Sequence, residues 1–481
     1  MVMGLNFEMT GVVAGNEAGG QSSIDIFNPY NNERVGSVPS LDVKAIIESI
    51  NYANGYKANL KRSERFDILM LAKDLLMHRK HEFARLITLE SGLCLHDTLH
   101  EVERACDVLL FSAQQALSDD GAIMPCDVTA SRNNRVIYTK REPLSGIIVA
   151  ITPFNHPLNQ VVHKVAPAIA SNNRIIVKPS EKTPLTAILF AKLLYEAGLP
   201  IHMFQVVTAK ADVFADIVMN HDGVDLISFT GSSSVGKAIS KAAGYKRLVL
   251  ELGGNDPLIV CNDADLKIAA ALAASGSFAN SGQRCTAVKR ILVDSKVKSE
   301  FIELFKIEAM KFKSGDPMDE STRVGCVIDK QSAQSIFDRI DSAIAGGAKL
   351  MFGGEGSGAL IQPTIISNVN PSMALVANET FGPTAPIMEF GSIDEAISIS
   401  NNTRFGLSAG IVTNNLNYIS KFVNELEVGT INFNEVLRYR TESSPFGGIK
   451  DSGLGYKEGV VETYKGYTNI KTYSLPWERN Y

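Results

Sequence analysis

Short, largely apolar segments alternate with stretches of helical periodicity between residues 146 and 251. Strands that are apolar on both faces occur where helices cover both sides of a parallel sheet. The expected strands are 146–151, 174–178, 204–207, 224–229 and 247–251. The sequence therefore predicts an α/β fold built on a parallel sheet, whose ligands bind beyond the carboxyl ends of the strands.

The rest of the chain predicts a second α/β region and a small edge sheet. A helix over 265–280 and a strand at 290–293 belong to the second region. The polar, β-rich tail 462–473 is expected to pair with 136–139. An exposed sheet edge is normally covered, and another subunit is the simplest cover.

Composition excludes several classes of protein. The net charge is −5, so no basic surplus indicates nucleic acid or an anionic membrane as a partner. Six cysteines without a CxxC pair are too few for a disulfide scaffold, and the eight histidines form no metal-binding motif, so no metal is expected. Residues 1–20 lack a basic start followed by an apolar block. We expect a cytoplasmic enzyme without a signal peptide or membrane span.

The segment Phe229-Thr-Gly-Ser-Ser-Ser-Val-Gly-Lys-Ala238 follows a predicted strand and opens a predicted helix. Backbone N–H groups at such a helix N-terminus suit a phosphate, although a glycine turn with a serine N-cap explains the segment equally well. The segment differs from a P-loop only at Ala238, where a Mg²⁺-binding Ser or Thr would stand. This difference disfavours a nucleotide hydrolase. No GxGxxG motif follows any of these strands.

Two residues are candidates for acyl chemistry. Cys285 lies in a polar loop beside Arg284, which is expected to ease its ionisation to the nucleophilic thiolate. Glu251 stands between two leucines, and burial there would raise its pKa toward that of a general base near neutrality. The alternatives are a loop cysteine without a role and a structural acid that caps the following Gly-Gly turn.

Asn155 supplies the third candidate group. It lies in Thr152-Pro-Phe-Asn-His-Pro157, a loop that two prolines stiffen just after a predicted strand. An amide on a rigid loop can donate to a developing oxyanion, although an ordinary turn-forming Asn fits the residue alone. A thiol, an acid and an amide beside a phosphate-binding loop are the groups that chemistry through a thioester needs.

Six ordered segments resemble the aldehyde dehydrogenase superfamily over nearly the full length of the chain. They are Thr152–Pro157, Val177–Glu181, Phe229–Ser232, Leu250–Gly254, Gly282–Cys285 and Glu379–Pro383. The resemblance implies a Rossmann-type cofactor-binding domain, a catalytic domain and a β-rich oligomerisation arm in a homodimer or homotetramer. The implied boundaries are 1–126 and 145–253 for the first domain, 254–450 for the second, and 127–144 with 460–481 for the arm.

The resemblance also implies a role for each site residue. Cys285 would attack the aldehyde carbon, Asn155 and the Cys285 backbone N–H would hold the oxyanion, and Glu251 would activate water. NAD is the expected cofactor, with NADP as the alternative, because a Glu near the adenosine ribose repels a 2′-phosphate. The expected cofactor-binding residues are Pro153, Phe154, Lys178, Ser180, Glu181, Gly231, Ser232, Gly236, Glu379 and Phe381.

The segment Gly-Gln-Arg-Cys-Thr-Ala-Val-Lys-Arg resembles the branch that oxidises small anionic aldehydes. Phosphonoacetaldehyde is the favoured substrate, and lactaldehyde, succinic semialdehyde and glyceraldehyde 3-phosphate are the alternatives. A guanidinium fork fits phosphonate or carboxylate oxygens, although most arginines form ordinary ion pairs. The expected substrate-binding residues are Arg104, His156, Arg284, Arg440 and Ser443, with Arg438 as an alternative to Arg440.

Overall fold

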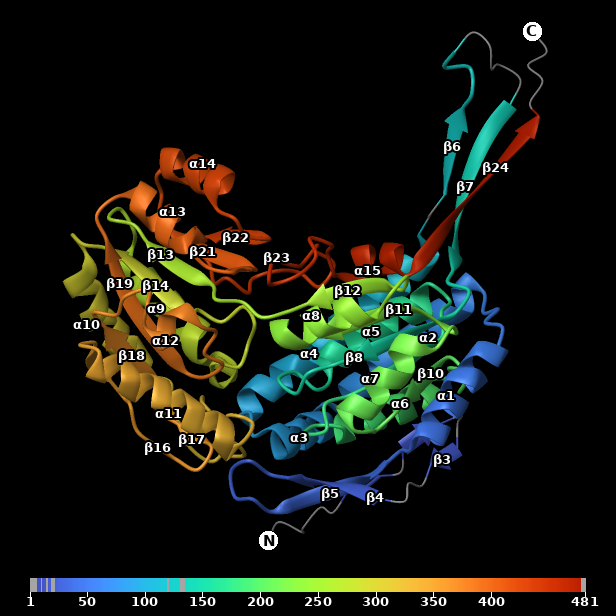
Figure 1. The fold of residues 1–481 in the computed structure, drawn as a ribbon, viewed down its shortest axis with the longest axis horizontal. Coiled ribbons are helices and arrows are strands. Elements are labelled where there is room, and N and C mark those ends of the chain that lie inside the picture. The colour runs from blue at the N-terminus through green and yellow to red at the C-terminus, as the bar shows by residue number, and fades with distance from the viewer. Residues whose placement is uncertain are drawn as a thin grey trace.

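The computed structural model describes residues 7–9, 11–13, 16–18, 22–118, 121–129 and 135–476. Two α/β bodies lie side by side, and a narrow β-arm projects from one of them (Figure 1). The predicted α/β class and the strands predicted between residues 146 and 251 are confirmed. Among the described residues, no helix combines the length and the apolar character needed to cross a membrane.

The first body contains a seven-stranded sheet in the order β12-β11-β8-β9-β10-β2-β3. The first five strands in this order are parallel, and β2 and β3 add antiparallel at the other edge. The strands are β8 (Ile147–Ile151), β9 (Ile175–Lys178), β10 (Phe204–Val206), β11 (Val224–Thr230), β12 (Arg247–Glu251), β2 (Gly11–Val13) and β3 (Asn16–Ala18). Strands β9 and β11 flank β8 on opposite sides. The order in which successive strands are added to the sheet therefore reverses between β8 and β11, and such sheets bind ligands at that point.

Helices cover both faces of this sheet, which explains its apolar strands. Ile148 and Ala150 of β8 pack with the helices of one face, and Ile147 and Val149 pack with those of the other. The first face carries α2 (Arg62–His78), α3 (Lys80–Ser91), α4 (Leu95–Leu117), α5 (Asn159–Ala170) and α6 (Leu185–Glu196). The second face carries α1 (Val43–Gly55), α7 (Ala211–Asn220) and α8 (Ser233–Ala242).

The second body is another seven-stranded sheet, parallel except for its first strand. In spatial order the strands are β15 (Lys349–Phe352), β18 (Thr364–Ser367), β19 (Thr384–Phe390), β14 (Arg290–Asp294), β13 (Pro257–Val260), β21 (Ser408–Val412) and β22 (Thr430–Phe433). One face carries α9 (Leu266–Phe278) and α10 (Lys298–Ala309). The other carries α11 (Lys330–Ala345), α12 (Ala374–Ala377), α13 (Ile393–Asn401) and α14 (Leu416–Glu425).

The arm is a three-stranded antiparallel sheet of β6 (Ala122–Pro125), β7 (Arg135–Pro143) and β24 (Thr468–Pro476). The predicted pairing of the tail is confirmed, because Thr472 faces Thr139. The β-structure predicted from residue 462 is wrong at its start, since α15 (Val460–Gly466) is helical. Val460 and Tyr464, one helical turn apart, bury their side chains in the core of the first body. The arm sheet starts at residue 122, before the predicted boundary at 127.

Small elements complete the described structure. They are the sheet of β1 (Phe7–Glu8), β5 (Arg34–Ser40) and β4 (Ser22–Phe27), the pair β16 (Gly356–Ser357) and β17 (Leu360–Ile361), the pair β20 (Phe405–Gly406) and β23 (Ile449–Lys450), and the 3-10 turn η1 (Ala279–Gly282). The turn η1 leads directly into the loop that carries Cys285.

Candidate active site

A cavity of about 490 Å³ lies where loops of the two bodies meet. Helix α4, the loops after β8 and β22 and the loop after η1 all contribute to its walls. The sequence-predicted residues that line it are Arg104, Asn155, His156, Arg284, Cys285, Arg438 and Arg440. The structure therefore brings the thiol, the amide and all four candidate arginines into one space.

The turn η1 holds the Cys285 loop in an unusual backbone conformation. Asn280, Ser281 and Gly282 have φ angles of 60°, 53° and 68°, three successive left-handed residues, a conformation in which non-glycine residues are strained. The Asn280 N–H donates to the Asp97 carboxylate at 2.7 Å. A side chain at position 282 would overlap the carbonyl of Gly382. The packing around this turn thus fixes the direction in which the next residues leave it.

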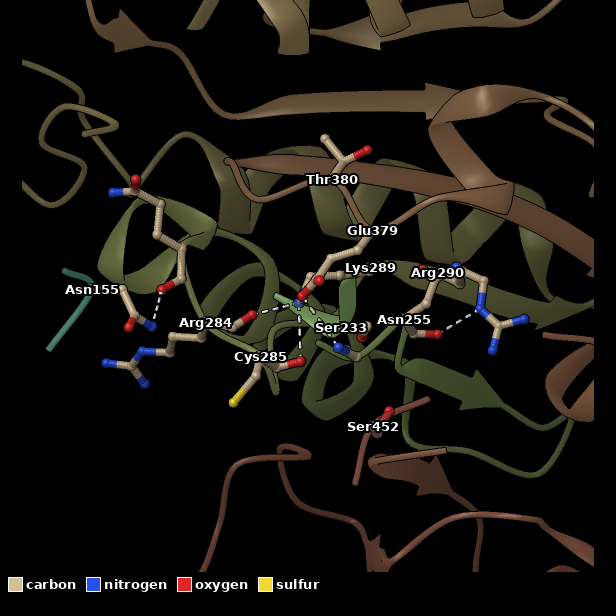
Figure 2. A network of polar contacts seen from close by, with 12 residues as sticks. Asn155, Ser233, Asn255, Arg284, Cys285, Lys289, Arg290, Glu379, Thr380 and Ser452 are labelled. Carbon is tan, nitrogen blue, oxygen red and sulfur yellow. Dashed lines mark hydrogen bonds and ion pairs between the residues drawn. The ribbon is translucent and has the colours of Figure 1, made fainter. Parts of the chain in front are cut away.

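Asn155 is tied directly to the Cys285 loop. Its Nδ2 donates to the Gln283 carbonyl at 2.8 Å (Figure 2). Asn280 Nδ2 donates to the Asn155 carbonyl at 3.1 Å. Glu101 accepts the backbone N–H groups of residues 158 and 159 at 2.8 and 2.9 Å, which caps the start of α5. The amide is thereby held beside the nucleophile loop from both of its sides.

The Cys285 thiol is half-buried, and its environment opposes ionisation. Burial raises its pKa to about 11, and the carboxylates of Asp256, Glu379 and Glu251 act in the same direction. Lys289 acts against them. The expectation that the neighbouring arginine makes this thiol easier to ionise is therefore wrong, because desolvation outweighs the nearby positive charge.

Glu251 is the last residue of β12 and is only 4% exposed. Burial raises its pKa well above the usual value, and the Glu458 carboxylate adds to this shift. Glu458 accepts a hydrogen bond from the fully buried Lys164 at 2.7 Å, so a cation stands behind the two acids. The predicted direction of the Glu251 pKa is confirmed. A carboxylate whose pKa is raised toward neutrality is a stronger base than an ordinary carboxylate, so it can accept a proton near neutral pH.

Two of the cavity arginines share one carboxylate as their ion-pair partner. Glu442 lies 2.6 Å from Arg104 Nε, 2.6 Å from His163 Nε2 and 4.0 Å from Arg440. Arg440 also stacks on the ring of Phe446, at 3.9 Å from the ring centre. The guanidinium groups of Arg104 and Arg440 therefore already have partners within the chain.

Arg284 and Arg438 differ from this pair. In the part of the chain that the structure describes, neither guanidinium forms a hydrogen bond or an ion pair, and the Nε atom of each is buried without a partner. Arg284 is 6% exposed, and burial lowers its pKa to about 9. His156 Nε2 is likewise buried and unpartnered. Buried polar groups are normally hydrogen-bonded, so these unpartnered donors are available to bind a ligand with anionic oxygens.

Ser443 is the one predicted substrate residue outside the cavity lining. Its hydroxyl lies 3.1 Å from that of Thr441. Arg438 and Arg440 both line the cavity, and Arg438 is the one without a partner among the described residues. The preference for Arg440 over Arg438 as an anion-binding residue is therefore reversed by the pairing of the two side chains.

The phosphate-loop candidates lie at the carboxyl end of β11, beside the point between β8 and β11 where the strand order reverses. Ser232 is the N-cap of α8, and its hydroxyl accepts the Val235 N–H at 3.4 Å. A side chain at Gly236 would overlap Leu252, so only glycine lets α8 approach the loop after β12 this closely. The P-loop-like lysine of the segment, Lys237, pairs with Asp451 at 2.6 Å instead of facing the loop N–H groups.

The other cofactor candidates occupy the same edge of the sheet. Lys178 ends β9, and its ammonium lies 3.2 Å from the carboxylate of Glu181, which is 40% exposed. Ser180 lies between them and accepts the Lys182 N–H. Exposed acceptors beside a buried cation, next to a helix N-terminus, fit the ribose and pyrophosphate of a dinucleotide.

Phe154 and Phe381 join the two bodies at this edge. Their rings meet edge to face at 6.0 Å, and Pro153 precedes Phe154 in the same loop. Glu379, two residues before Phe381, accepts the Gly254 N–H at 3.2 Å. The predicted nicotinamide-side residues therefore lie next to the loop that follows Glu251.

Several site residues were not found by sequence reasoning. They are Lys289, Glu442, His163, Lys164, Glu458 and Asp256. Some carry a visible signal, because a His-Lys pair interrupts the apolar middle of α5 and a Lys-Arg pair stands at the start of the apolar strand β14. Charged residues inside such segments are rarely buried unless they are paired.

Loss of the Glu442 charge is expected to destabilise the fold. Although burial alone would raise it, His163 and Arg104 hold the pKa of Glu442 well below its usual value. The substitution Glu442→Gln should lower the free energy of unfolding by about 3 kcal/mol, because cations remain buried without their counter-charge. The stabilisation is present above the unfolded pKa, near 4.3, and is lost as pH falls further toward the folded pKa. Urea unfolding at pH 7 measures the first effect, and urea unfolding at a series of pH values below 4 measures the second.

The exposed pair Lys450–Glu427 provides the matched control for this substitution. Glu427→Gln should change the free energy of unfolding by less than about 1 kcal/mol, because water screens exposed ion pairs. Equal effects of the two substitutions would show that the Glu442 cluster does not stabilise the fold.

Comparison with known proteins places this site in a family. The sequence model of the aldehyde dehydrogenase family matches residues 16–473. The chain belongs to the aldehyde dehydrogenase family, and it is an oxidoreductase that acts on aldehydes. The predicted family resemblance is thereby confirmed, and the nucleotide hydrolase alternative is set aside.

Its relatives include enzymes named for small polar aldehydes, one neutral and others anionic. The chain is 38% identical over 459 residues to the lactaldehyde dehydrogenase of Methanococcus maripaludis, covering 94% of this chain and 97% of that protein. It is 37% identical over 437 residues to the 3-sulfolactaldehyde dehydrogenase of Priestia aryabhattai, covering 91% of each. The NADP complex of NADP-dependent glyceraldehyde-3-phosphate dehydrogenase from Bacillus halodurans matches with a TM-score of 0.95 and 34% identity, over 98% of this chain and all of that one.

Proposed function

We propose that this enzyme oxidises a short anionic aldehyde to its carboxylate through a thioester at Cys285. The observation that carries the proposal is the shared cavity of the thiol and two guanidinium groups, Arg284 and Arg438, that form no hydrogen bond or ion pair among the described residues. A phosphonate or sulfonate accepts bidentate hydrogen bonds from such groups. An aldehyde one or two carbons away from that anion would lie next to the thiol.

In the proposed mechanism, the Cys285 thiol loses its proton to solvent, and the thiolate sulfur adds to the carbonyl carbon. The developing oxyanion is held by Asn155 Nδ2 and by the backbone N–H of Cys285. A bound nicotinamide would supply the acceptor for the hydride that leaves the thiohemiacetal carbon. Glu251 then takes a proton from the water that attacks the thioester, and the carboxylate product leaves as the thiol is restored.

The residues at the sheet edge fit a nicotinamide dinucleotide. The N-terminus of α8 with Gly231 and Ser232 would hold the pyrophosphate, and Glu379 the nicotinamide ribose. The Glu181 carboxylate would accept the adenosine ribose hydroxyls and repel a 2′-phosphate, which favours NAD over NADP. Lys178 beside it leaves NADP as the alternative.

Among anionic aldehydes, phosphonoacetaldehyde is our first candidate. The cavity guanidinium groups that form no ion pair among the described residues favour a strongly anionic head group, and the similarity to a sulfolactaldehyde enzyme points to the same class. 3-Sulfolactaldehyde, succinic semialdehyde and glyceraldehyde 3-phosphate are the anionic alternatives, and lactaldehyde, which carries no charge, is the neutral alternative. An initial-rate panel of these aldehydes with NAD⁺ and NADP⁺ tests the proposal. A higher kcat/KM for propanal than for every anionic aldehyde would contradict it.

Loss of the Arg284 charge should affect anionic substrates selectively. A charge-assisted contact contributes about 1.5–3 kcal/mol, so Arg284→Leu should raise KM for phosphonoacetaldehyde by roughly 10- to 150-fold. The KM for propanal should change little, because propanal has no anionic group. Steady-state kinetics on both substrates measure the difference, and equal changes for the two aldehydes would refute a role in anion recognition.

We further propose that the chain forms a homodimer or homotetramer through its arm. Sheet β6-β7-β24 leaves edge strands with exposed apolar side chains, among them Ile123, Met124 and Ile470. Such edges are normally covered by another chain. Light scattering tests this assembly, and a monomer at micromolar concentration would contradict it. A cytoplasmic location stays a prediction.

A further inference from the structure

Lys289 occupies a buried position at the junction of the nucleophile loop and the second body. It is 4% exposed and directly precedes β14. Its ammonium donates to the carbonyl of Arg284 and, at 3.0 Å, to the carbonyl of Cys285 itself. A third partner, Glu379 Oε1, lies 3.4 Å away (Figure 2). The three donors of the ammonium thus find acceptors on two separate loops.

Burying an ammonium group is costly unless it is paired and hydrogen-bonded. A fully apolar side chain would satisfy the core at position 289 without that cost. The carbonyl groups of the nucleophile loop would then lose a buried donor, and Glu379 would lose its cation. Removal of the Lys289 ammonium should therefore have two separate effects, one on the nucleophile loop and one on Glu379.

Glu379 connects the same ammonium to the proposed cofactor site. Its Oε1 also accepts the Gly254 N–H at 3.2 Å, in the loop that follows Glu251. The Lys289 ammonium lies 5.5 Å from the ring centre of Phe381. One buried cation is therefore in contact with the nucleophile backbone, with Glu379 and with the aromatic residue of the nicotinamide side.

We propose that Lys289 is a positioning residue that joins the Cys285 backbone to the Glu379 carboxylate and so sets both thiol reactivity and cofactor affinity. The inference rests on the proposed function, which assigns Glu379 to the cofactor ribose. In this arrangement Lys289 touches neither the aldehyde nor the reacting atoms. It acts through the residues that do.

The pH dependence of thiol alkylation reports one half of this role. The charged groups that act on the Cys285 thiol come from every element around it: Lys289 before β14, Asp256 before β13, Glu379 before β19, Glu251 at the end of β12 and Arg440 after β22. Lys289 and Arg440 are the two cations of this set and favour the thiolate, the three carboxylates oppose it, and Lys289 has the largest effect of the charged groups on the thiol. Its removal should therefore move the alkylation profile toward higher pH.

The test compares Lys289→Met with wild type in two measurements. Iodoacetamide labelling of Cys285, located by peptide mass spectrometry, should shift its midpoint up by about one pH unit. The dissociation constant of the reduced cofactor should rise about tenfold, and Glu379→Gln should have a much smaller additional effect in the Lys289→Met background than in wild type. Lys289→Arg, which keeps the charge, should restore part of both.

Arg290 offers a matched control for the loss of a buried cation. Its guanidinium donates to the carbonyls of Asn255, Ile399 and Ser400, away from Cys285. Arg290→Met should lower stability but leave the alkylation midpoint unchanged. The proposal is overturned if folded Lys289→Met labels like wild type, or if Arg290→Met shifts the midpoint equally. Neither measurement needs turnover, so a protein inactive toward every aldehyde would contradict the proposed function and still test Lys289.

Discussion

Replacing Cys285 with alanine is expected to lower aldehyde oxidation by roughly 10⁴-fold or more, because no other group can form the thioester. The cavity should otherwise persist, since the turn η1 and Asn155 contact the backbone of the nucleophile loop rather than the sulfur. The dissociation constant of the cofactor should stay within a few-fold of wild type. Initial rates and cofactor binding by fluorescence measure the two quantities.

The half-buried Cys126 supplies the control for this experiment. It lies outside the residues that line the cavity. Cys126→Ala should oxidise aldehydes like wild type. Retained turnover in folded Cys285→Ala would remove the covalent mechanism, whichever aldehyde is the substrate.

Replacing Glu251 with glutamine is expected to separate the two halves of the reaction. Thioester formation should continue, whereas hydrolysis should slow by roughly 10²–10⁴-fold, the usual contribution of a general base. The first turnover should then appear as a burst of reduced cofactor, followed by a much slower steady rate. Stopped-flow absorbance at the reduced nicotinamide band records both phases.

The wild-type pH profile tests the same residue. Since burial raises the pKa of Glu251, its basic form accumulates only as pH rises through that elevated value. Turnover should therefore increase from mildly acidic toward alkaline pH, and Glu251→Gln should lose this limb. Glu435, an acid that lines the cavity of Cys285, is the control, because its carboxylate accepts its neighbour's N–H. Equal losses in Glu435→Gln and Glu251→Gln would refute a specific base.

The first sheet was predictable because burial on both faces leaves apolar runs in the sequence. Strands such as Ile147–Ile151 need no tertiary information to be recognised. The start of the tail was misjudged because its β-rich composition concealed Val460 and Tyr464, which are spaced to bury one face of a helix. Packing against the core of the first body, rather than the β-propensity of its residues, determined that residues 460–466 form a helix.

The chemistry of the site was predictable in kind but not in its electrostatics. Asn155, Glu251 and Cys285 stand out because each is a polar residue at the end of a strand or in a glycine-containing loop. The thiol pKa depends on burial and on Lys289 and Asp256, which contact the site only in the folded chain. For the same reason, the sequence could not distinguish an arginine paired with Glu442 from one left without a partner.

Direct detection of an acyl group on Cys285 tests the central claim most directly. Glu251→Gln should be incubated with an anionic aldehyde and oxidised cofactor, quenched in acid, and its peptides examined by mass spectrometry. The thioester mechanism predicts the mass of the acyl group on the peptide that contains Cys285, dependent on cofactor. Reduced cofactor formed without any adduct at Cys285, or with the adduct on another cysteine, would contradict it.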